Sequence, residues 1–429
     1  MIPNKYVNIL KESSIVLIVE YILLAAQVFL TYTINHKFGV NSVGDYALLI
    51  TVAQITVQGL GQSFSPLIRR DLSIKGQNAA INYVNNTNYF RIIFTVVAIL
   101  GVVMSMPFFS ENMKKLSFFL ILIMFSKGFE MLNETYFVTY QSLSKYKLYA
   151  TVKLFYSLLV WINLLLFYFA YDNLNLFYSS QVLLGISFFI FNILVFKALA
   201  TEKNNFKFTI KLSAEKKELL KEAWPLMVNA LIFQASSRLN VIVLYNIIGA
   251  KELGIFSILI LFSNIFAGVG NSIGVVLISK FTISANNSII RFKTLYKKSL
   301  FAFFFIGLFL AILFLFSVPY LLKFYKLDFS HTGNINFIIG CGIPILFVTG
   351  CVGGIFLILK SQIIGVYVSL LVLLLNIPIY IILATKFGLF GGGYAYIITA
   401  LLQLFLIVFW SVKIINRKSL KIFPTEIIN

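Results

Sequence analysis

The sequence predicts an all-α integral membrane protein, in which about twelve transmembrane helices form two six-helix bundles related by a parallel internal repeat. Three observations carry this prediction: an apolar composition, a series of apolar runs long enough to cross a bilayer, and the repeat itself. Hydrophobic residues make up 59% of the 429 residues, and charged residues only 12%. Soluble domains have roughly 45–50% apolar and about 25% charged residues. A water-soluble fold could not cover this much apolar surface, whereas lipid can.

The spans follow one another along the whole chain. A helix needs about 20 mostly apolar residues to cross the hydrocarbon core, and twelve segments meet this condition. They lie near residues 14–34, 44–66, 90–109, 116–138, 150–170, 176–196, 224–246, 254–278, 299–319, 335–358, 363–384 and 390–412. The runs do not alternate in polarity, as strands of a membrane β-barrel would, so the spans are expected to be helices.

A basic segment divides the spans into two sets of equal number. We expect an N-terminal six-helix bundle over residues 1–196, a cytoplasmic linker over 197–223 and a C-terminal six-helix bundle over 224–429. The end of the linker, SAEKKELLKEAW from Ser213, has the pattern of a capped amphipathic helix on the membrane surface.

The two halves open with the same sequence pattern. FGVNSVGDYALLI (residues 38–50) aligns without gaps with IGAKELGIFSILI (residues 248–260), at a constant offset of 210. The matched pairs include Gly39 with Gly249, Gly44 with Gly254, and Tyr46 with Phe256. Because each half has an even number of spans, the repeats share one orientation and are related by an axis along the membrane normal. This arrangement predicts two bundles that face each other across a central space.

The net charge of +20 is explained by orientation in a membrane. Most of the 35 Lys and Arg residues fall in loops on one side of the predicted spans, which the positive-inside rule assigns to the cytoplasm together with both termini. We expect these loops to meet anionic lipid headgroups. A nucleic-acid surface would need Arg and exposed aromatic residues on a folded domain, so nucleic acid is not an expected partner. The polar start of the chain lacks the pattern of a cleavable signal peptide.

Polar side chains inside the spans mark the candidate site, because ionisable groups in a bilayer usually face a cavity or a partner. They recur at helical spacing, and the first, second, seventh and eighth spans each have one polar side. For each amide, a hydrogen bond that only holds the bundle together remains the alternative explanation. The proposed substrate-binding residues are Gln54, Gln58, Gln62, Arg69, Gln234, Arg238, Asn264 and Asn271.

Arg238 is the strongest of these predictions, because no acidic residue lies within four positions of it on its own helix. Such a cation is expected to face water or an anionic ligand, and the planar guanidinium suits phosphate. Three carboxylates in the spans are candidates for ion coupling: Glu20, Glu130 and Glu134. Lys127 shares a helix face with Glu130 and Glu134 and can neutralise one of them, so Glu20 ranks first.

The chain shows no Walker A, HExxH or GxSxG sequence, so we expect neither an enzyme nor a cofactor. The spans, the basic midpoint segment and the hairpin FGVNSVGDYALLI together resemble the bacterial O-antigen and polysaccharide repeat-unit flippases. These flippases belong to the multidrug/oligosaccharidyl-lipid/polysaccharide exporter superfamily. The likeness covers the chain by topology and, at motif level, residues 38–69 and 224–274.

The resemblance implies that the protein moves an undecaprenyl-diphosphate-linked oligosaccharide across the bacterial inner membrane by alternating access. It also implies a polysaccharide polymerase and a chain-length regulator as partners. Two alternatives stay open: a cation-coupled multidrug antiporter of the same superfamily, and a membrane scaffold for polysaccharide assembly that transports nothing.

Overall fold

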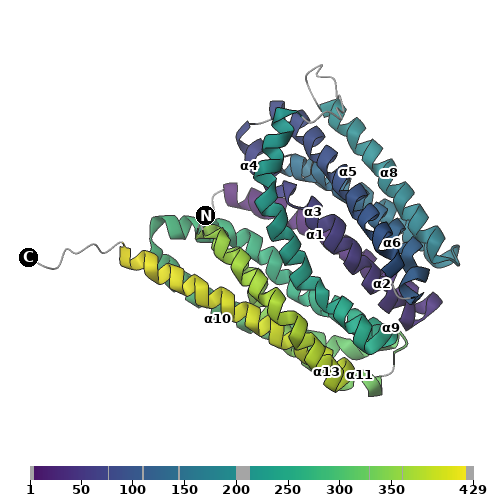
Figure 1. Cartoon of the computed structure of the whole chain (residues 1–429). Helices are drawn as coiled ribbons and strands as arrows, with labels where there is room; N and C mark the ends of the chain where they lie inside the picture. Colours follow the sequence, from purple (N-terminus) through teal and green to yellow (C-terminus); the bar gives the residue numbers. More distant parts are fainter. Residues whose placement is uncertain are drawn as a thin grey trace, which may run out of the picture. The chain divides into compact units, whose positions relative to one another are not determined.

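A computed structural model describes residues 4–75, 77–108, 111–143, 145–199, 213–327, 329–359 and 361–421. Every regular element in these ranges is a helix (Figure 1). In chain order they are α1 (Asn4–Phe38), α2 (Val40–Ala53), the π-helix η1 (Gln54–Gln58), α3 (Gly59–Gly61), α4 (Phe64–Lys75), η2 (Gln77–Ala79), α5 (Ala80–Ser105), η3 (Met106–Phe108), α6 (Glu111–Ser142), α7 (Tyr146–Phe169), α8 (Leu174–Leu199), α9 (Ala214–Asn287), α10 (Ile289–Phe324), α11 (Phe329–Val352), α12 (Ile355–Ile358) and α13 (Gln362–Lys421).

The predicted multi-pass architecture is confirmed. Nine helices among the described residues are long and apolar enough to cross a membrane. Two of the nine are each long enough for two crossings, and each is interrupted by a glycine in a non-helical conformation, Gly249 in α9 and Gly388 in α13. When these two are divided and α1 is added, the described residues provide twelve helical segments, one at each predicted span.

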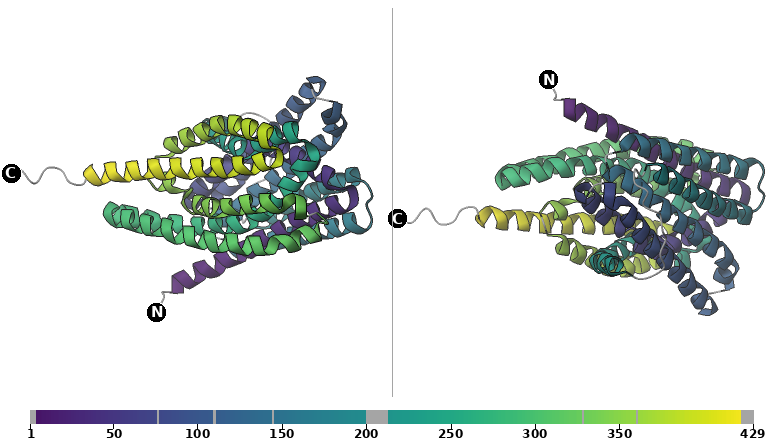
Figure 2. Two further views of the ribbon diagram at one scale, coloured as in Figure 1. Left: turned by 90° about the horizontal axis from the view of Figure 1, so that it is seen from below. Right: turned by 90° about the horizontal axis from the view of Figure 1, so that it is seen from above.

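The helices pack into two compact units. The first unit contains the chain up to Thr33 together with Asp45–Arg238, and the second contains Ile34–Gly44 together with the chain from Leu239. Within the second unit α10 packs against both α11 and α13, and both views of Figure 2 show α10 and the C-terminal part of α13 with roughly parallel axes but opposite chain directions. The boundaries at residues 196 and 224, which the sequence suggested, remain a prediction.

Each unit has its own apolar core. In the first unit, aromatic side chains of α6, α7 and α8, such as Tyr136, Tyr149 and Phe188, form the centre of one cluster. In the second, Phe292, Phe347 and their neighbours from α10, α11 and α13 form another. Many large apolar side chains remain exposed on the outer helix faces, as expected where lipid replaces water.

The internal repeat is visible in the backbone. Gly39 and Gly249, which the alignment pairs, both have a φ of 82°, a conformation that residues with a Cβ rarely adopt. Each ends one helix and begins the next. The sequence repeat therefore marks the same sharp turn in both halves.

The second pair of matched glycines makes a reciprocal contact inside the second unit. A Cβ on Gly44 would lie 1.9 Å from the carbonyl oxygen of Ala250, and a Cβ on Gly254 would lie 2.2 Å from that of Val40. At the offset of 210, Val40 corresponds to Ala250 and Gly44 to Gly254. The first turns of the two helices thus pack together, with each glycine against the backbone of the other repeat. The contact is reciprocal, as in an interface with two-fold symmetry.

The amphipathic segment after residue 212 differs from its prediction in one respect. The backbone N–H of Lys216 donates to the Ser213 hydroxyl at 3.3 Å, which is the predicted cap. No separate surface helix follows, however, because α9 continues from Ala214 through Pro225 into the seventh span. Leu219, Ala223 and Met227 pack on Phe64 and Phe90, so an apolar face anchors the start of α9 to the first unit.

Candidate functional site

The second span of the first unit is not a regular α-helix. Between α2 and α3 the chain forms a π-helix at Gln54–Gln58, in which the N–H of Gly59 donates to the carbonyl of Gln54. The Thr56 hydroxyl donates to the Val52 carbonyl at 2.8 Å, and this side-chain bond competes with the regular backbone pattern. Single π-turns inside α-helices occur frequently at functional sites.

A second interruption follows directly. The helix stops after Gly61, and Gln62 and Ser63 form a turn before α4 begins at Phe64. The amide of Ser65 donates to the Gln62 carbonyl at 3.1 Å, so the carbonyl of Gly61 loses the donor that an α-helix would supply. Two glycines within three residues weaken the helix here. The regular α-helix of the second span is therefore interrupted where it carries its polar side chains.

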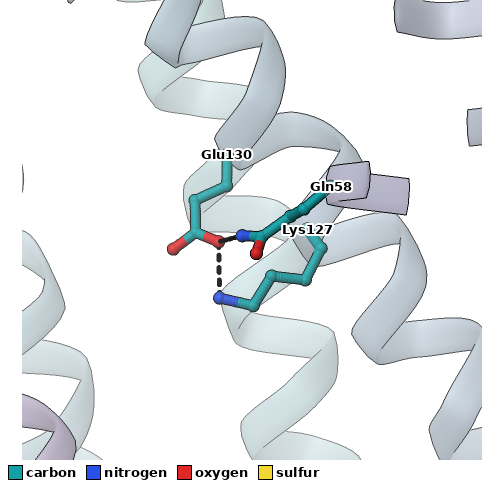
Figure 3. A network of polar contacts seen from close by, with 3 residues as sticks. All are labelled: Gln58, Lys127 and Glu130. Atoms are coloured by element: carbon teal, nitrogen blue, oxygen red, sulfur yellow. Dashed lines mark hydrogen bonds and ion pairs between the residues drawn. The ribbon is translucent and has the colours of Figure 1, made fainter. Parts of the chain in front are cut away.

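Gln58, Glu130 and Lys127 form the first polar group of the site (Figure 3). The Gln58 amide Nε2 donates to Glu130 Oε2 at 3.3 Å, and Lys127 Nζ lies 2.5 Å from the same oxygen. The side chain of Lys127 is 14% exposed and that of Glu130 38% exposed. The ion pair that the sequence predicted on α6 forms, and η1 adds an amide to it.

Gln62, Gln234 and Arg238 form the second polar group. Gln234 Nε2 donates to Gln62 Oε1 at 2.8 Å, and Arg238 Nε donates to Gln234 Oε1 at 3.2 Å. No carboxylate among the described residues lies within ion-pair distance of the Arg238 guanidinium, and no hydrogen bond is described for its two terminal nitrogens. Gln234 therefore orients the arginine through Nε and leaves the fork available to an anion.

Gln54, Gln58 and Gln62 are spaced four residues apart and were expected to form one glutamine stripe on the polar side of the second span, but the structure gives them different neighbours. Gln58 reaches α6, whereas Gln62 is exposed and reaches α9. Gln54 is only 7% exposed, and its Oε1 has no donor among the described residues. The π-helix and the turn at 62–63 change the direction of successive side chains, so equal spacing in sequence no longer means one face.

Three of the other predicted residues have described side chains: Arg69, Glu134 and Asn264. Arg69 is exposed and donates to Gln141 at 3.4 Å, and Glu134 lies on α6 in a partly buried position. Asn264 is exposed in the second unit. The side chains of Glu20 and Asn271 lie outside the described residues, so their assignments stay predictions.

One buried cation next to these groups was not predicted. Arg91 lies near the start of the third predicted span and is only 1% exposed, with hydrogen bonds to both the second span and α6. An arginine one residue inside a span end has the same pattern as an interfacial cation, so the sequence offered no reason to place it in the core.

Comparisons with known proteins identify the fold. No protein-family model and no curated protein sequence matches the chain. Among solved structures, the chain is similar to the MATE multidrug transporter DinF-BH, with a TM-score of 0.68 at 15% identity over 96% of each chain. It is also similar to the lipid II flippase MurJ in an inward closed conformation, with a TM-score of 0.63 at 18% identity over 94% of this chain and 89% of that one. The eukaryotic MATE transporter AtDTX14 gives 0.63 at 12% identity, over 96% and 99% of the two chains. The chain thus shares the fold of these MATE transporters and of the lipid II flippase.

Proposed function

We propose that this protein is a flippase that moves a saccharide linked to undecaprenyl diphosphate, an O-antigen or capsule repeat unit, across the bacterial inner membrane. The observation that carries the proposal is Arg238, a cation in a predicted span whose terminal nitrogens have no described acceptor and whose Nε is held by Gln234. A diphosphate offers the paired oxygens that a guanidinium fork binds best. The likeness to a lipid II flippase supports the same substrate class.

The polar side chains of the site bind different parts of such a substrate. Arg238 binds the diphosphate, while the exposed amide Gln62 is within reach of sugar hydroxyls. Lys127 and Glu130 neutralise each other, so the first polar group adds no net charge to the site. The lipid tail stays in the bilayer beside the protein, and the two halves alternate in opening the site to each side. In the cell, both termini are cytoplasmic, and a polymerase and a chain-length regulator receive the product.

A cation-coupled multidrug antiporter is the second candidate. It is favoured by the MATE transporters among the structural neighbours and by the Glu130 carboxylate, which remains 38% exposed beside Lys127. An antiporter needs a carboxylate that exchanges ions with water, and Glu20, Glu130 and Glu134 remain the proposed coupling residues. A scaffold that transports nothing would need none of these buried polar contacts.

Deletion of the gene separates the candidates. A flippase mutant loses surface polysaccharide and accumulates the lipid-linked repeat unit on the cytoplasmic leaflet, and Arg238→Ala should do the same at normal protein abundance. The matched control is Arg291→Ala, because Arg291 is an exposed arginine at the start of α10. Normal polymer together with increased drug sensitivity would instead indicate the antiporter. Wild-type polymer in the Arg238→Ala strain would refute the proposed role of this arginine.

A further inference from the structure

Arg91 is the most deeply buried cation among the described residues, and neither polar group of the candidate site includes it. A buried guanidinium is costly unless its N–H groups find acceptors. The acceptors that Arg91 finds are informative, because they come from the two elements that carry the candidate site.

On one side, Arg91 holds the interrupted second span. Its Nε donates to the carbonyl of Gly61 at 3.1 Å, and its Nη2 donates to the Ser65 hydroxyl at 3.0 Å. On the other side, its Nη1 donates to the carbonyl of Met131 and to the Thr135 hydroxyl, both on α6. One side chain thus joins the end of α3, the start of α4 and the middle of α6.

The contact with Gly61 repairs the break in the helix. The Ser65 amide would donate to the Gly61 carbonyl in an α-helix, but here it donates to Gln62. A carbonyl without a donor is costly at membrane depth, and breaks in spans persist only where other groups satisfy the backbone. Arg91 supplies the missing donor and therefore stabilises the interrupted form of the span.

We propose that Arg91 is the positioning residue of the candidate site: by clamping the break in the second span to α6, it holds Gln58 at Glu130 and Gln62 at Gln234. Gly61 and Met131 each lie next to a residue of these pairs in the sequence, so their carbonyls fix the backbones that carry them. This role in substrate binding rests on the proposed function, whereas the clamp itself does not.

The clamp is tested by hydrogen exchange on Arg91→Lys in lipid nanodiscs. Lysine keeps the charge, but its ammonium has three N–H donors on one nitrogen and so cannot satisfy the four acceptors that Arg91 contacts through three nitrogens. Amides in peptides that cover residues 59–69 should exchange about tenfold faster, while peptides from α7 (Tyr146–Phe169) should not change. The control is Lys153→Arg, since Lys153 is also buried in the first unit but donates to Tyr149, away from the break. Unchanged exchange at 59–69, or an equal increase across the whole unit, would overturn the proposal.

Positioning is tested by a double-mutant cycle, with binding of undecaprenyl diphosphate as the measurement. Arg91→Lys and Gln62→Ala should each weaken binding about five- to tenfold, because each loosens the Gln62–Gln234 contact that orients Arg238. The double variant should be no weaker than either single variant within about twofold, because both changes remove one arrangement. Losses that multiply would overturn the positioning role. If the wild-type protein does not bind undecaprenyl diphosphate, the proposed function fails, and the exchange experiment alone decides on the clamp.

Discussion

The reciprocal glycine contact predicts a matched pair of destabilising substitutions, Gly44→Ala and Gly254→Ala. In each variant the new methyl group meets the backbone of the other repeat, at 1.9 Å from the Ala250 carbonyl oxygen and 2.2 Å from that of Val40. A carbon and a carbonyl oxygen ordinarily come no closer than about 3.3 Å. Because the obstacle is backbone, a change of side-chain rotamer cannot relieve the overlap, and the two helices must move apart.

The magnitude follows from two opposing effects. Forcing a methyl group into a filled contact costs about 1–3 kcal/mol and occasionally more. Alanine in place of glycine returns up to about 1 kcal/mol of helix propensity. Each substitution should therefore lower the free energy of unfolding by roughly 1–2 kcal/mol. Since both act on one crossing, the double variant should lose less than the sum of the two.

The measurement is thermal unfolding of the purified protein in one detergent. Gly101→Ala is the control, because Gly101 lies in α5 and a Cβ there would have no heavy atom within 4 Å. That variant should be as stable as the wild type or more stable. The reasoning is refuted if Gly44→Ala and Gly254→Ala unfold at the wild-type temperature, or if only one of them is destabilised.

Two further substitutions address the polar groups. Lys127→Met leaves the Glu130 carboxylate without its cation, so it should lower the free energy of unfolding by about 1–3 kcal/mol. Adding Glu130→Gln should recover part of the lost stability, measured as the melting temperature. Additive losses in the double variant would contradict the pairing. Gln234→Leu keeps the size of the side chain but breaks the link between Gln62 and Arg238, so transport should fall about tenfold at unchanged abundance. Gln181→Leu in α8, a glutamine with no described hydrogen bond, should leave transport unchanged, and equal effects of the two leucine variants would count against the orienting role of Gln234.

The fold could be predicted because its determinants are additive along the sequence. Each span is recognised by its length and hydropathy alone. Gly39 and Gly249 share a positive φ, which their residue type and their matched positions in the repeat indicate. The continuity of α9 could not be predicted in the same way. Whether an amphipathic segment joins the next span depends on Leu219 and Met227 packing against Phe64 and Phe90, which are contacts between distant parts of the chain.

The candidate site was predictable only where it depends on one helix. Lys127 and Glu130 are three residues apart on α6, and their ion pair follows from helical spacing. Gln58 and Gln62 contact different helices because a π-helix and a turn interrupt the second span. The Arg91 side chain donates to the Gly61 carbonyl beside that turn. Regular periodicity cannot reveal an irregular helix, so both Arg91 and the separate directions of Gln58 and Gln62 were missed.

The most direct test of the central claim is flipping by the purified protein. Proteoliposomes would contain a fluorescent saccharide linked to undecaprenyl diphosphate, and a membrane-impermeant quencher would report its movement between leaflets. The proposed function predicts rapid movement with the wild-type protein and Arg291→Ala, slower movement with Arg238→Lys, and the protein-free rate with Arg238→Ala. Movement at the wild-type rate with Arg238→Ala would contradict the assignment of the diphosphate to Arg238, and no movement with the wild-type protein would contradict the flippase itself.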